Sequence, residues 1–102
     1  MAFRKAARVN DIPPGQVRVV SVADEDIALC NVAGRIYAVA NVCTHDGGPL
    51  GEGALQADQI ECPRHGARFD VRTGAVKSLP AIVPIPIFEV KVVGEEILVD
   101  VD

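Results

Sequence analysis

The chain has 102 residues, 49% of them hydrophobic and only 4% aromatic, with a formal net charge of −4. This length predicts one domain with a real core, and the absence of a basic stripe argues against nucleic-acid binding. The sequence contains neither an apolar signal core nor an apolar run of membrane-spanning length, so we expect a cytoplasmic protein that is not attached to a membrane.

Short strands separated by turns are predicted for the first part of the chain. The apolar residues are mainly Val, Ile, Leu and Ala, a composition that favours strands. The expected strands are residues 3–9, 17–22, 27–33 and 36–40, with turns at 10–15, 23–26 and 34–35. Cys30 has the same alternation as Ala28 and Val32, which predicts a buried structural thiol and not a metal ligand.

The second part of the chain also has a strand pattern. Prolines at positions 80, 84 and 86 exclude a central strand from residues 79–86. The expected strands are residues 55–62, 67–71, 87–93 and 97–101, with turns at 72–74 and 94–96. No segment has a convincing helical period. The predicted fold class is all-β, a single domain over residues 1–102 built as an antiparallel sandwich or meander.

Two short clusters of metal-ligand side chains interrupt this pattern. Cys43 and His45 form the first cluster, and Cys62 and His65 form the second. A zinc finger usually takes both Cys from one cluster and both His from the other. One Cys and one His in each cluster suits a [2Fe–2S] centre, in which the Cys pair ligates one iron and the His pair the other. A zinc-bound interaction module stays the alternative.

The residues around the ligands agree with an iron–sulfur site. Gly47, Gly48 and Gly66 let backbone N–H groups approach a cluster, and Pro49 and Pro63 stiffen the turns. The sequences CTHDGGPL and CPRHG closely resemble the two binding loops of the Rieske family. The run from residue 68 to the end resembles the closing third of the small Rieske ferredoxins that serve bacterial ring-hydroxylating dioxygenases.

This resemblance implies a fold, a cofactor and a function. The expected Rieske fold has a cluster-binding subdomain at about residues 41–80, made of two hairpin loops, with one [2Fe–2S] cluster. The expected partners are a flavin-containing reductase and a terminal oxygenase of aromatic hydrocarbon catabolism, between which the chain carries one electron. The alternative is a Rieske-like small subunit of a larger oxidoreductase, such as assimilatory nitrite reductase.

We do not expect the chain itself to be an enzyme. A cluster whose ligand positions are all filled by protein has no open coordination site for a substrate. Ser21 and Ser78 lack a free His to activate them, because both His of the sequence are assigned to the cluster. One-electron transfer is the chemistry that remains.

Four positions differ from the respiratory Rieske proteins. Those proteins carry an additional Cys in each loop, where this chain has Gly48 and Arg64, so no disulfide can link the loops. This agrees with a reducing compartment. Respiratory members also have a Ser and a Tyr hydroxyl after the second loop, where this chain has Ala67 and Phe69. We therefore expect a reduction potential toward the low end of the Rieske range.

Charged residues near the ligands admit two interpretations. Asp46 and Asp70 either cap turns, which we favour, or serve the cluster by tuning its charge or by docking a partner. Arg64 and Arg68 form either docking contacts or salt bridges within the loops. The acidic residues at 24–26 and 95–96 are interpreted first as a solvated surface and second as a docking face for a basic partner.

Overall fold

The computed structural model describes residues 2–44, 47–64, 66–79, 81 and 83–101. In these residues the secondary structure consists of strands and two 3-10 turns. The strands are β1 (Phe3–Arg8), β2 (Val17–Val22), β3 (Glu25–Val32), β4 (Arg35–Ala40), β5 (Leu55–Gln56), β6 (Gln59–Glu61), β7 (Arg68–Asp70), β8 (Val76–Ser78), β9 (Ile87–Phe88), β10 (Val90–Val93) and β11 (Glu96–Asp100). The turns are η1 (Val9–Asp11) and η2 (Leu50–Glu52). A search of these residues finds no helix that is long and apolar enough to span a membrane.

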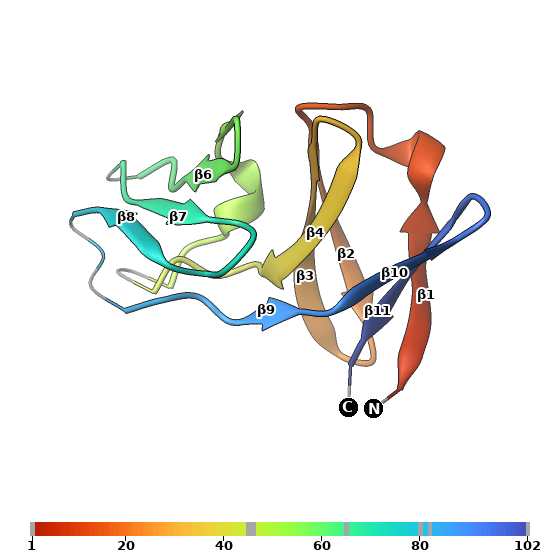
Figure 1. Cartoon of the computed structure of the whole chain (residues 1–102). Helices are drawn as coiled ribbons and strands as arrows, with labels where there is room; N and C mark the ends of the chain where they lie inside the picture. Colours follow the sequence, from red (N-terminus) through yellow and green to blue (C-terminus); the bar gives the residue numbers. More distant parts are fainter. Residues whose placement is uncertain (1, 45–46, 65, 80, 82, 102) are drawn as a thin grey trace.

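The strands form three antiparallel sheets. Their orders are β1-β11-β10, β2-β3-β4-β9 and β5-β6-β7-β8. Figure 1 shows the β5–β8 sheet at one end of the molecule, the β1-β11-β10 sheet at the other, and the two termini side by side. The predicted all-β class is confirmed.

The sheet of β2, β3, β4 and β9 has a hydrophobic core on each face. Ala28 and Cys30 of β3 point into the core that reaches the β5–β8 sheet, together with Phe69 of β7. Ile27 and Leu29 of β3 point into the other core, together with Ile97 of β11. Both side-chain faces of β3 are therefore buried, as expected of a central strand covered on both sides.

The predicted burial of Cys30 is confirmed. Its side chain is fully buried, and burial raises the pKa of the thiol to about 12. A thiol in such surroundings stays protonated and chemically inert.

The structure differs from the strand prediction in three details and adds one pairing for which no prediction was made. The expected strand 55–62 is a hairpin, in which Ala57 turns the chain with a positive φ of 54° between β5 and β6. The expected strand 87–93 is two strands, because β9 pairs with β4 and β10 pairs with β11. Strand β8 was not expected, and it pairs with β7. The first strand pairs with β11 at the far end of the sequence.

The segment between β8 and β9 is called the connector (residues 79–86). The exclusion of a central strand there is confirmed for its described residues, none of which is in a strand. Ala81 and Ile85 are buried in the same core as Cys30. The connector is thus fixed by apolar contacts rather than by strand pairing.

Candidate metal centre

The first ligand cluster lies on a short loop closed by its own backbone. In this loop, called loop 1 (residues 43–50), the N–H of Cys43 donates to the carbonyl oxygen of Gly48 at 2.8 Å. The N–H of Gly47 donates to the carbonyl oxygen of Cys43 at 2.7 Å. Loop 1 joins β4 of one sheet to β5 of another, so it is not the tip of a strand pair.

The second cluster lies on a loop with the same backbone bonds. In loop 2 (residues 62–69), the N–H of Cys62 donates to the carbonyl oxygen of Ala67 at 2.7 Å, and the N–H of Gly66 donates back to Cys62 at 3.1 Å. As in loop 1, the residue that donates to the Cys stands four positions after it, and the residue that accepts from the Cys stands five positions after it. Loop 2 is the tip of the β6–β7 hairpin, as predicted. Two loops of one design thus present one Cys each.

Glycine is required at the matching position of both loops. Gly47 and Gly66 each have a φ of 76°, in the region that residues with a Cβ rarely adopt. Both donate the N–H that closes the turn onto the preceding Cys. The predicted role of these glycines therefore has a concrete form, a left-handed residue that ends each ligand turn.

The two cysteines are buried in one core. Cys43 and Cys62 are 0% and 1% exposed and belong to the same hydrophobic cluster. The residue seven positions after each Cys, Leu50 or Phe69, is also fully buried there. This packing fixes the depth of each loop against the body of the protein. Two thiols on matched turns fit the donor set of a [2Fe–2S] cluster, which binds Cys as thiolate.

His45, His65 and Asp46 lie outside the described residues. In the sequence, His45 lies between Cys43 and Gly47, and His65 lies between Cys62 and Gly66. A search of the described residues finds no group of three or more potential metal ligands. The assignment of the ligands accordingly combines the loop backbone with the sequence.

Side-chain hydroxyl groups tie the loops to their neighbours without a disulfide. The Thr44 hydroxyl of loop 1 donates to the carbonyl oxygen of Val83 in the connector at 2.5 Å. The Ser78 hydroxyl of β8 donates to the carbonyl oxygen of Gly66 in loop 2 at 3.4 Å. None of the three cysteines, all of which lie in the described part of the chain, forms a disulfide. Sequence reasoning did not find these contacts, because a lone Thr or Ser carries no signal for a distant carbonyl group.

The exit of loop 1 packs against the strand that leads to loop 2. The N–H of Gly51 donates to Oδ1 of Asn41 at 2.6 Å, which joins η2 to the end of β4. Gly53 lies directly against the backbone of Glu61, the residue that precedes Cys62. Each contact sets the position of one ligand loop relative to the rest of the protein.

A charged network follows loop 2. Oδ1 of Asp70 accepts the backbone N–H of Arg72 at 2.8 Å, so turn capping, the favoured interpretation of Asp70, is confirmed. The Arg72 side chain also binds Asp70 and lowers the pKa of that carboxyl. Arg72 further pairs with Asp58 at 3.1 Å. Arg72 thereby links the turn between β5 and β6 to the end of β7.

Arg68 and Glu61 form a salt bridge across the β6–β7 pair, at 3.0 Å from Nε to Oε1. The interpretation of Arg68 as a salt-bridge residue is confirmed. Both side chains are partly exposed, so the pair stabilises the hairpin only weakly.

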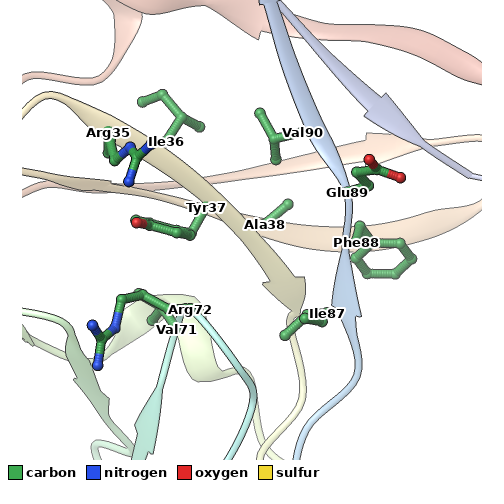
Figure 2. Close-up of a pocket in the computed structure, with 10 residues that line it drawn as sticks. All are labelled: Arg35, Ile36, Tyr37, Ala38, Val71, Arg72, Ile87, Phe88, Glu89 and Val90. Atoms are coloured by element: carbon green, nitrogen blue, oxygen red, sulfur yellow. The ribbon is translucent and has the colours of Figure 1, made fainter.

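A hollow of about 360 Å³ lies away from the loops. Figure 2 shows Tyr37 of β4 above Arg72 and Val71, with Ile87 to the right of both. Neither Cys43 nor Cys62, the two predicted ligands among the described residues, lines it. The loops, and not this hollow, are therefore the candidate centre.

Comparison with known families gives one decisive match. The model of the Rieske [2Fe-2S] domain matches residues 2–99, nearly the whole chain. The chain therefore belongs to the Rieske [2Fe-2S] domain family.

Similar proteins agree in sequence and in fold. The biphenyl 2,3-dioxygenase ferredoxin component of Rhodococcus jostii (strain RHA1) is 41% identical over 100% of this chain and 95% of its own length. The ferredoxin of carbazole 1,9a-dioxygenase from Nocardioides aromaticivorans IC177 matches with a TM-score of 0.92 and 35% identity, covering 97% of each chain. A chain in a complex of reduced oxygenase and oxidized ferredoxin of carbazole 1,9a-dioxygenase matches at 0.89 with 40% identity, covering 95% of this chain and 91% of that chain.

Proposed function

We propose that this member of the Rieske family is the ferredoxin component of a ring-hydroxylating dioxygenase system and carries one electron at a time to a terminal oxygenase. The observation that carries the proposal is the pair of loops with identical backbone bonds and one buried Cys each. The high coverage of relatives named as ferredoxin components supports it.

Four side chains are assigned to one [2Fe–2S] cluster within the subdomain of about residues 41–80. Cys43 and Cys62 would hold one iron, and His45 and His65 the other. When bound, this group supplies reversible one-electron chemistry. Ligation by two thiolates and two imidazoles, rather than by four thiolates, would make the cluster easier to reduce, because imidazole is neutral.

The protein around the loops has three tasks. Buried residues such as Leu50 and Phe69 keep water away from the thiolates. The Thr44 and Ser78 hydroxyls hold the loops in place in either redox state, since neither bond depends on a thiol. Rigid surroundings favour electron transfer, because little has to move when the charge changes.

The proposed partners are a flavin-containing reductase as donor and a terminal oxygenase as acceptor. The solved complex of reduced oxygenase and oxidized ferredoxin in carbazole 1,9a-dioxygenase supports the second partner. We propose a carrier without catalysis of its own that works in the cytoplasm. The 41% identity to a ferredoxin component over the whole chain favours this carrier over the small subunit of a larger oxidoreductase.

The purified protein tests the proposal directly. We expect a brown protein with two iron atoms and two labile sulfides per chain, and an electron paramagnetic resonance signal of mixed N and S ligation after reduction. Stoichiometric zinc without iron, from cells grown with sufficient iron, would support the zinc module instead.

A further inference from the structure

Two large apolar side chains stand exposed on the connector beside the ligand loops. Leu79 and Val83 are 75% and 52% exposed, whereas Ala81 between them and Ile85 after them are buried. The buried residues anchor the connector in the core. The exposed ones are therefore held out on a fixed backbone, which is the arrangement of a binding surface rather than of a loose loop.

Val83 and the residue before Leu79 each form a hydrogen bond with one ligand loop. The carbonyl oxygen of Val83 accepts the Thr44 hydroxyl, and Thr44 directly follows the first Cys. Leu79 directly follows Ser78, whose hydroxyl binds Gly66 of loop 2. Figure 1 shows the chain between β8 and β9 passing the same end of the molecule as both loops. A cluster held by these loops would pass its electron fastest to a partner that approaches this end.

The connector is also free of charge. Between Lys77 and Glu89 the sequence contains no Asp, Glu, Lys or Arg. Glu95 lies in the turn between β10 and β11, and Glu96 begins β11. Figure 1 shows this turn at the opposite end of the molecule. A protein interface typically has an apolar centre and a polar rim, and the exposed Lys77 lies two residues before Leu79 in the sequence.

We propose that Leu79 and Val83 form the apolar centre of the contact with the terminal oxygenase, and that this contact forms by burial of apolar surface with little charge steering. The inference rests on the proposed function, because it names the surface by which that partner is recognised. The matching oxygenase surface is expected to be apolar and weakly charged.

The test uses the iron-loaded protein with its cognate oxygenase and compares three variants. We expect Leu79→Ser and Val83→Ser each to weaken binding, measured by calorimetry, by about three- to tenfold, and to slow electron transfer similarly. Val93→Ser is the matched control, because Val93 of β10 is 51% exposed, far from the loops. All three should keep the absorption spectrum and reduction potential of the wild type.

Salt dependence supplies the second measurement. We expect the transfer rate to change by less than about threefold between low and physiological salt, whereas steered association changes by tenfold or more. Equal binding by Val83→Ser and Val93→Ser, or a steep loss of rate with salt, would overturn the inference and leave the proposed function intact. A wild-type protein that carries the cluster but passes no electron to the oxygenase would overturn both.

Discussion

Gly53 lies so close to Glu61 that a Cβ atom at position 53 would overlap the carbonyl oxygen of Glu61. Gly53 has an ordinary φ of −84°, so the requirement for glycine is one of space and not of backbone conformation. The contact joins the exit of loop 1 to the last residue before Cys62. It therefore sets the distance between the two ligand loops.

We expect Gly53→Ala to destabilise the protein by about 3 kcal/mol, because the added methyl group meets backbone that cannot rotate away. The cluster content after purification should fall as well. Thermal unfolding followed at the visible absorption band measures the first effect, and iron analysis the second.

Gly51→Ala is the informative comparison. Its Cβ would overlap a methyl group of Val19, a partly exposed side chain of β2. Adding Val19→Ala should recover part of the stability of Gly51→Ala, whereas the same addition should do nothing for Gly53→Ala. If Val19→Ala restored stability to both variants, the overlap with the Glu61 backbone would not be the cause of the instability of Gly53→Ala.

The ligand assignment predicts different results for His65 and Cys30. In His65→Cys we expect the mixed-ligand signal to be lost or strongly altered, and the potential of any remaining cluster to fall, because a thiolate adds negative charge. Cys30→Ala should keep the signal at a stability cost of about 1–2 kcal/mol for the lost packing. Loss of the cluster in Cys30→Ala would mean that the ligands are wrongly assigned.

The sequence predicted the fold class and the burial of Cys30 because both follow from local alternation. The pairing of β1 with β11 is not local, and no residue pattern in either strand predicts the other strand as its partner. The turn at Ala57 was missed because Ala rarely adopts a positive φ. In the site, the Cys and Gly spacing predicted both loops, while the contacts of Thr44 and Ser78 appear only once the chain is folded.

Asp70 should stabilise the fold over a defined pH range. Hydrogen bonds from Arg72 lower the pKa of Asp70 from 3.8, so the charged form is favoured in the folded state. This contribution is complete above the unfolded pKa and is lost only as the pH falls below it toward the lower folded pKa. We expect Asp70→Asn to melt about 5 °C lower than the wild type, by a difference that stays constant from pH 8 to pH 5. A difference that shrinks within that range would contradict the lowered pKa.

The reduction potential should lie toward the low end of the Rieske range, which runs from roughly −150 to +300 mV. A hydroxyl group that donates to a cluster sulfur stabilises the reduced form and raises the potential. Ala67 and Phe69 offer none, and both are fully buried directly after the turn of loop 2. Ala67→Ser with Phe69→Tyr should therefore raise the potential measured by voltammetry at neutral pH. Ala28→Ser adds a hydroxyl at an equally buried position on β3 and should leave the potential unchanged. A wild-type potential well above zero, or an equal shift in the Ala28 variant, would refute the explanation.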